Sequence, residues 1–252
     1  MEIAAYVQAL RTHGHALVGA AEAAGLDTPV PTCPTWCVRD LVAHVGGVQR
    51  WATSYVRTCD TEPPTRESQA VFFDAPSDDG LLDWFRAGCT ELADTLAAAD
   101  PAMECWSFLR APSPLAFWAR RQAHEAGIHR VDAETARGPV TAFEPEFAAD
   151  GIDELLCGFL ARRRGRLVAD PPVTLAVRAT DVEAAWTVAV HPDHREVTAG
   201  PGGLEGADCL VEGPASDLYL VLWNRAGTEP LDVTGDRSVL ELWREKATIF
   251  WS

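Results

Sequence analysis

The sequence has very little lysine and no long hydrophobic run. Lys246 is its single lysine, and 21 basic against 37 acidic residues give a formal net charge of −16. Nucleic acids and anionic membrane surfaces bind basic patches, so this balance argues against both as partners. No apolar run approaches the roughly 18 residues of a membrane span, and no basic segment precedes an apolar run at the N-terminus. We therefore expect no signal peptide and a soluble, cytoplasmic protein.

The cysteines do not show the regular spacing of a disulfide framework. There are seven, an odd number, and three residues separate Cys33 from Cys37, where redox and zinc-knuckle motifs have two. In a chain of 252 residues they indicate reduced thiols that are mostly buried. The length allows one large or two ordinary domains. Abundant alanine and the excess of arginine over lysine indicate a GC-rich genome, as in actinobacteria.

Helical periodicity dominates the first half of the chain. Apolar residues recur at helical spacing over about 2–24, 37–58, 77–100 and 114–137. The segments 59–76 and 102–112 carry no such pattern and are interpreted as loop and irregular connection. Four helices of this length with apolar faces predict an antiparallel four-helix bundle, which we place at residues 1–140.

The pattern changes after residues 138–145, which we interpret as a linker. A helix predicted at about 147–164 precedes segments of period two around 173–177, 185–190, 195–198 and 208–211. Pro214 is expected to begin a helix that runs through Arg225, and Asp236 to cap a last helix over 237–249. The fold class is therefore predicted as α+β, with the bundle followed by a small α+β domain at 146–252.

The fourth predicted helix carries a pair of metal-binding side chains. Glu125 and His129 are four residues apart, so at about 100° per residue both leave the same face of the helix. A carboxylate and an imidazole on one face are ligands that suit zinc. His124 does not join them, because five residues place its ring roughly 140° from that of His129. The alternative is a solvated polar stripe that also includes Gln122 and Asp132.

His44 in the second predicted helix is the candidate third ligand. Its neighbours at helical spacing, such as Leu41 and Val48, are apolar, which is also typical of a hydrogen-bonded histidine in a protein core. In a bundle, however, the same face can meet Glu125 and His129 of another helix. Two histidines and one glutamate leave a coordination position for water or substrate, as catalytic rather than structural zinc sites do.

Two sequence blocks carry a resemblance to a known family. They are PTCPTWCVRDLVAHVGGV at 31–48 and FWARRQAHEAGIHRVDAE at 117–134, and weaker similarity continues through 222–225 and 233–236. They resemble the mycothiol-dependent maleylpyruvate isomerase family, one of the DinB-like metal-binding helical bundles. The resemblance implies a sterol-carrier-like C-terminal domain and metal ligands at His44, Glu125 and His129. Thr35 and Cys37 depart from the glycine and the serine or threonine that the family often has there.

A thiol is a poor helix cap. Because Cys37 stands at the expected N-terminus of the second helix, we expect either that Thr35 takes over the capping or that the first turn frays.

The resemblance implies an enzyme that depends on zinc, or another divalent metal, and on mycothiol as thiol cosubstrate. In its reaction the thiolate adds to the cis double bond of maleylpyruvate, the new single bond rotates, and elimination releases the trans isomer and the thiol. The same thiolate can attack another small electrophile, so an S-transferase remains an alternative. The non-catalytic alternatives are a metalloprotein that binds a thiol or apolar ligand, and a zinc-dependent regulator. The oligomeric state is left open.

Binding an anionic substrate on an acidic chain requires local arginines. Arg120, Arg121 and Arg130 on the fourth helix are candidates, and Arg225 is the residue to which we assign a catalytic role. The bundle is expected to hold the metal alone, with Arg225 completing the substrate site from the second domain.

Three further residues complete the expectations. Asp132, three residues after His129, is a candidate acceptor for the second ring nitrogen of that histidine, with a backbone carbonyl as the alternative. His191 and His194 lie in a predicted turn and are interpreted as surface residues rather than ligands.

Overall fold

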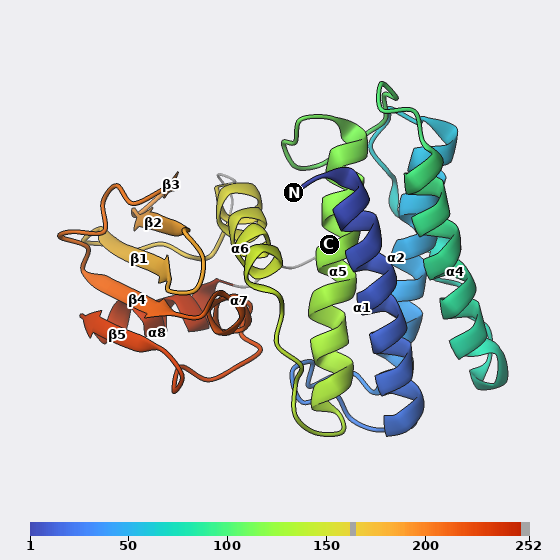
Figure 1. The fold of residues 1–252 in the computed structure, drawn as a ribbon, viewed down its shortest axis with the longest axis horizontal. Coiled ribbons are helices and arrows are strands. Elements are labelled where there is room, and N and C mark those ends of the chain that lie inside the picture. Colours follow the sequence, from blue (N-terminus) through green and yellow to red (C-terminus); the bar gives the residue numbers. More distant parts are fainter. Residues whose placement is uncertain (162–164, 248–252) are drawn as a thin grey trace. The chain divides into compact units, whose positions relative to one another are not determined.

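The computed structural model describes residues 1–161 and 165–247, and the chain divides into two compact units, Met1–Thr141 and Ala142–Ser252. The first unit is helical, and the second combines helices with a five-stranded sheet (Figure 1). The predicted α+β class is confirmed. Within the ranges described, no helix is long and apolar enough to cross a membrane.

Four long helices form the first unit: α1 (Ile3–Ala24), α2 (Val38–Thr58), α4 (Asp78–Ala98) and α5 (Pro114–Thr135). Helix α1 packs on α4 and α5, and α2 packs on the same two helices. Ser113 caps α5, its hydroxyl accepting a hydrogen bond from the Ala116 N–H at 3.1 Å, with Pro114 at the first helical position. Helix α5 therefore starts where the sequence predicts it.

The prediction that residues 59–76 form a loop is wrong in part. It contains the short helix α3 (Arg66–Ala70) and the 3₁₀ turn η1 (Val71–Phe73). Thr65 caps α3 by accepting a hydrogen bond from the Ser68 N–H at 3.1 Å. The turn η1 packs on α2, where a Cβ added to Gly47 would meet the Phe73 ring at 2.5 Å. The missing side chain at Gly47 thus makes room for Phe73, a relation that periodicity does not reveal.

The N-terminus of α2 follows neither expected alternative. Cys37 is itself the N-cap residue and the helix begins at Val38. The Asp40 carboxylate accepts the backbone N–H of Cys37 at 2.9 Å, and the Cys37 thiol lies 3.1 Å from the same oxygen. The carboxylate at the third helical position thus satisfies the backbone donor that a capping box normally satisfies.

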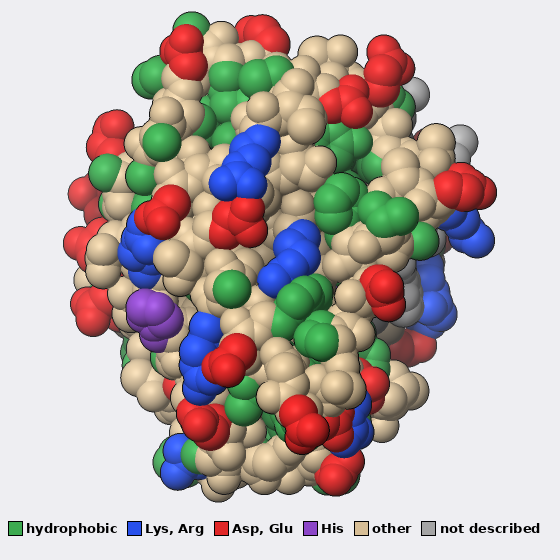
Figure 2. All heavy atoms as spheres, turned by 90° about the vertical axis from the view of Figure 1, so that its right-hand side faces the viewer, with side chains coloured by type: hydrophobic (Ala, Val, Ile, Leu, Met, Phe, Trp, Pro, Cys, Tyr) green, Lys and Arg blue, Asp and Glu red, His purple; other side chains and the backbone are tan. Residues whose placement is uncertain are grey.

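Charged side chains of both signs are interspersed on the bundle face that Figure 2 shows. Exposed ion pairs such as Arg86–Glu22 at 2.8 Å and Arg57–Glu91 link neighbouring helices. Exposed pairs of this kind contribute about 0–1 kcal/mol each. Their main consequence is that positive charge on this face is dispersed rather than gathered into a patch that would suit nucleic acid.

The second unit begins with α6 (Pro145–Asp153), which continues as the π-helical segment η2 (Glu154–Leu160). The sheet order is β3-β2-β1-β4-β5, with β1 and β4 parallel and the other neighbours antiparallel. The remaining elements are β1 (Val173–Ala179), β2 (Ala185–Val190), β3 (Arg195–Ala199), β4 (Cys209–Gly213), α7 (Ala215–Leu222), β5 (Asp232–Gly235) and α8 (Arg237–Lys246).

Two expectations for the second unit are corrected. Strand β5 was not predicted, since its four residues are too short to show a period; Val233 pairs with Val211 of β4. Helix α7 ends at Leu222 rather than Arg225, because Asn224 adopts a left-handed backbone with φ 58°. The C-terminal ends predicted for the helices at 147–164 and 237–249 lie outside the described residues.

Candidate metal centre

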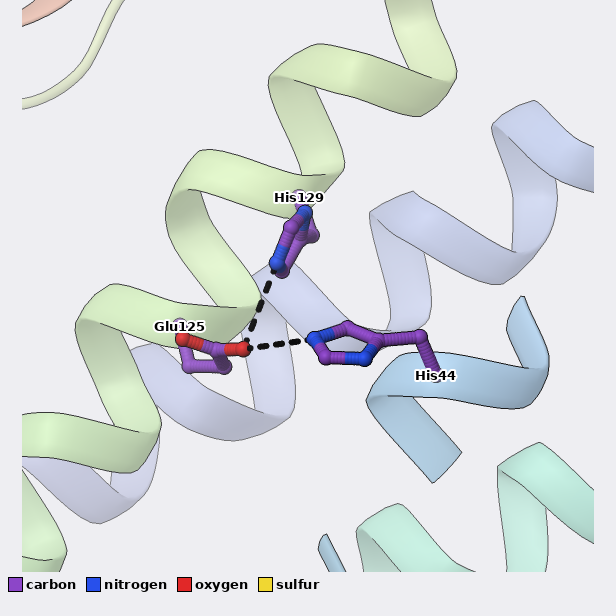
Figure 3. A group of neighbouring side chains, drawn as sticks. All are labelled: His44, Glu125 and His129. Carbon is purple, nitrogen blue, oxygen red and sulfur yellow. Dashed lines mark ion pairs between the residues drawn. The ribbon is translucent and has the colours of Figure 1, made fainter. Parts of the chain in front are cut away.

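His44 of α2 meets Glu125 and His129 of α5, and Figure 3 shows the three side chains pointing toward one another. Glu125 Oε1 lies 3.4 Å from His44 Nε2 and 3.2 Å from His129 Nε2. The side chains of Glu125 and His129 are 6% and 11% exposed and that of His44 is 22% exposed. The cluster is therefore mostly enclosed, with access from the side of His44.

The spacing of these atoms fits a divalent metal. Zinc–nitrogen and zinc–oxygen bonds of about 2.0–2.2 Å place neighbouring tetrahedral ligands about 3.3 Å apart, and the observed separations are 3.4 and 3.2 Å. Glu125 Oε1 is buried and accepts no well-aligned hydrogen bond from the described residues. A buried carboxylate oxygen in that state needs a cation or a proton nearby. Metal binding at this cluster is developed below as a proposal.

Two polar neighbours orient the candidate ligands. Arg121 Nη2 donates a hydrogen bond to Glu125 Oε2 at 3.0 Å, which leaves Oε1 directed at the imidazoles. Asp132 Oδ2 lies 2.8 Å from His129 Nδ1. Of the two expected partners for this ring nitrogen, the Asp132 carboxylate and a backbone carbonyl, the structure places the carboxylate there. Thr32, in the turn before α2, donates to Asp132 Oδ1 at 2.5 Å. Arg121 thus acts directly on the candidate ligand Glu125, Thr32 acts on His129 through Asp132, and neither role was found from the sequence.

The charges of this cluster are strongly coupled. Burial would raise the pKa of Glu125, but His129, His44 and Arg121 hold it well below its usual value. Burial would lower the pKa of His129, but Glu125 and Asp132 raise it to about 9. Without a metal, the carboxylate is therefore ionised near neutral pH and His129 carries the compensating proton.

The polar stripe of α5 is not solvated. Its four members are between 0% and 9% exposed: Gln122, Glu125, His129 and Asp132. The solvated-stripe interpretation is therefore wrong. Helix α5 buries side chains all around its circumference, polar ones included. The burial of Asp132 and Glu125 is possible because each accepts a hydrogen bond from a specific partner in the unit.

Aromatic rings flank the cluster. The Trp36 ring, in the turn before α2, lies 4.9 Å from that of His44 and 6.2 Å from that of His129. Phe73 of η1 lies 6.0 Å from the His44 ring and is 40% exposed. Trp36 belongs to the block that carries the family resemblance, whereas no sequence signal singled out Phe73. Together they give the open side of the cluster an apolar border.

The other candidates lie apart from the cluster or have partners. His124 is fully buried and packs edge-on against Tyr6 of α1, so it is not brought to the ligands. Arg121 pairs with Glu125, and Arg130 pairs with Glu134 at 3.1 Å. These two arginines are thus neutralised within the unit.

Arg120 is half-buried on α5. Arg225 belongs to the second unit and lies just after α7, where its Nη1 donates to the Trp223 carbonyl at 3.0 Å.

The bundle, its His–Glu–His cluster and the appended α+β unit define a class: two-domain proteins with a candidate metal site in an N-terminal helical bundle. Family models identify the group within that class. The model of the mycothiol maleylpyruvate isomerase N-terminal domain matches residues 7–134, and that of the corresponding C-terminal domain matches residues 146–242. The chain belongs to the mycothiol maleylpyruvate isomerase family, which confirms the resemblance seen in the sequence.

Solved structures share the fold. The crystal structure of the mycothiol-dependent maleylpyruvate isomerase aligns over 93% of both chains, with a TM-score of 0.64 and 13% sequence identity. The structure of a histidine-to-alanine mutant of that isomerase aligns with the same values. At this identity the likeness establishes a common fold. None of the curated proteins matches the chain.

Thr32→Val tests the indirect orientation of His129. The substitution keeps the side-chain volume but removes the donor to Asp132, and loss of an outer partner of a metal ligand costs about 10–100-fold in affinity. We expect zinc affinity, measured by competition with a chromophoric chelator, to fall by about tenfold. Thr90→Val, at an exposed position of α4, is the matched control. Equal affinities in the two variants would remove Thr32 from this role.

Acid sensitivity of the bundle should depend on His13 of α1. Burial, then Arg130 and His124, lower the pKa of His13 from 6.5 to about 3. Above pH 6.5, His13 is neutral in both the folded and the unfolded protein, and its contribution to stability is fully present. Between pH 6.5 and about 3, the unfolded chain binds a proton at His13 that the folded chain does not bind, so the free energy of unfolding falls as the pH drops. His13→Gln should show a smaller loss of unfolding free energy between pH 7 and pH 4.5, measured in urea. His15→Gln, two residues away and exposed, should retain the wild-type loss.

Proposed function

We propose that this protein is a metal- and mycothiol-dependent isomerase that converts the cis double bond of maleylpyruvate, or of a closely related small electrophile, to trans. The observation that carries the proposal is the convergence of His44, Glu125 and His129 on one point, where the buried Glu125 Oε1 accepts no well-aligned hydrogen bond from residues 1–161 and 165–247. Membership of the family and the mycothiol-dependent isomerase among the similar structures support the choice of reaction.

The three ligands would hold zinc or another divalent metal with a coordination position left over. The chemistry that such an ion supplies is stabilisation of a thiolate at neutral pH. The chain's own contribution is orientation: Arg121 fixes the Glu125 carboxylate, and Asp132 fixes the His129 ring. Preorganised ligands of this kind avoid rearrangement during the reaction.

The isomerisation consumes no reagent, because the thiol that adds to the substrate is released again. The mycothiol thiolate adds to one carbon of the cis double bond, and the bond becomes single and rotates. Elimination then re-forms the double bond as trans and releases the same thiol, so no oxidant or reductant is consumed. Trp36 and Phe73 border the cluster, and we assign them the exclusion of water and apolar contact with the substrate chain.

The anionic groups of the substrate require a cation from outside the α5 pairs, because Glu125 and Glu134 already neutralise Arg121 and Arg130. We assign this role to Arg225 of the second unit. A guanidinium is suited to it, since it can hold a carboxylate through two parallel hydrogen bonds.

The function is tested by incubating the zinc-loaded protein with mycothiol and a panel of electrophiles, and by identifying the products. We expect trans isomer from maleylpyruvate only when mycothiol is present, with no net consumption of thiol. Stable conjugates with an epoxide or halide, and no isomerisation, would instead identify an S-transferase. Thiol binding without any turnover would identify a non-catalytic binding protein.

A further inference from the structure

A second group of metal-ligating side chains lies at the end of the β2–β3 hairpin. His191 follows β2 and His194 precedes β3, and the His191 N–H donates to the His194 carbonyl at 2.9 Å. The strand register pairs Val190 with Arg195, so the two histidines stand opposite each other and their side chains share one face of the hairpin. Glu196, two residues after His194, lies on that face as well.

The donor atoms of this group are close together. One ligand atom from each of His191, His194 and Glu196 lies within 4.8 Å of the others. His194 Nε2 is 3.3 Å from Glu196 Oε1, which is about the separation of two neighbouring ligands on a tetrahedral zinc ion. Both histidines are partly exposed, and the His194 side chain is 41% exposed, so they lie at the surface as expected and an ion can reach them.

Neighbouring contacts prepare the two imidazoles for binding. Asp193 Oδ1 lies 2.7 Å from His194 Nδ1, so this carboxylate orients the ring, and Nε2 faces the Glu196 carboxylate with which it would share an ion. The His191 ring stacks on that of His194 with centroids 4.3 Å apart. His191 Nε2 is buried and makes no hydrogen bond to any described residue. A polar atom in this state is the kind that a bound ion or water satisfies.

We propose that His191, His194 and Glu196 form a second metal site, which takes a borderline divalent transition metal such as Zn²⁺, Ni²⁺ or Cu²⁺. Two imidazoles and one carboxylate select these ions over Mg²⁺ and Ca²⁺, which prefer oxygen ligands alone. Binding requires the rings to tilt out of their stack, a side-chain rotation that is fast at accessible positions. Because β3 is an edge strand, the ion would fasten the edge of the sheet.

The test is calorimetric titration of the full, untagged chain with Ni²⁺. Wild-type protein should bind about one Ni²⁺ per chain more than His191→Ala or His194→Ala does. If a variant still binds this additional ion, its affinity for the ion should be at least about tenfold lower than that of the wild type. Glu196→Gln should also weaken it. His15→Ala, at an exposed histidine of α1, should bind as the wild type does.

Unchanged stoichiometry and affinity in the His191→Ala and His194→Ala variants would overturn the site. Unchanged affinity in Glu196→Gln would overturn the assignment of three ligands. A second readout is thermal unfolding: Ni²⁺ should raise the unfolding temperature of the wild type more than that of the variants, because ligands that bind only the native state stabilise it. Neither result bears on the bundle site, which keeps its own ligands in these variants.

Discussion

In a His191→Ala background, which lacks the second proposed site, His44→Ala and His129→Ala should each lower bound zinc from about one atom per chain to less than about one tenth, and reduce turnover by at least about two orders of magnitude. Loss of an outer partner alone costs roughly 10–100-fold, and these changes remove one of three direct ligands. Zinc is measured by mass spectrometry after gel filtration, and turnover by the thiol-dependent isomerisation assay. Far-ultraviolet circular dichroism establishes that the bundle remains folded.

The matched control is His124→Gln. His124 neighbours Glu125 in the sequence but packs against Tyr6 of α1, so its replacement should leave the zinc content unchanged. Glu125→Gln keeps the size of the ligand and removes its charge, and it should lose zinc as the histidine variants do. A His124→Gln protein without zinc, together with a His44→Ala protein that retains it, would reject the assignment.

Arg225→Ala should lower kcat/KM by about 100-fold while zinc content stays the same. Removal of one donor that stabilises transition-state charge costs about 10²–10³-fold, and we expect the lower end for a carboxylate-binding residue. Arg225→Lys should recover part of the loss, since it keeps the charge but not the two parallel hydrogen bonds. Steady-state kinetics with mycothiol at saturation separate the effects on kcat and KM.

Arg178→Ala provides the comparison within the same unit. Arg178 lies on β1 and pairs with Glu212 on the neighbouring strand, so it should be kinetically silent. An Arg225→Ala enzyme as active as the Arg178→Ala enzyme would show that the second unit supplies no cation to the substrate. Loss of zinc in Arg225→Ala would contradict the independence of the bundle site.

Sequence spacing was informative wherever a relation is local. Four residues between Glu125 and His129 place both on one face of a helix, and five residues exclude His124. The start of α5 followed equally from Ser113 and Pro114. In each case the geometry of a single helix determines the relation, so no knowledge of its neighbours is needed.

Relations between elements were beyond that method. His44 meets α5 only because α2 and α5 pack together, and Thr32 reaches Asp132 across 100 residues of sequence. The position of the Phe73 ring depends on the space that the missing side chain of Gly47 leaves on α2, which the sequence pattern does not reveal. The burial of the α5 stripe went unpredicted for the same reason, since a run of polar side chains is ordinarily solvated unless each finds a partner elsewhere in the fold.

The short turn η1 places part of the apolar border of the candidate centre on a different segment from the proposed ligands. Phe73 borders the candidate centre from a segment between α2 and α4, whereas the proposed ligands lie on α2 and α5 themselves. Its ring packs directly on Gly47, where an added Cβ would lie 2.5 Å from it, so a side chain at position 47 would displace the ring at position 73. If the proposed function holds, a change of side chain at position 73 should alter the apolar border of the substrate site while the three proposed metal ligands stay in place.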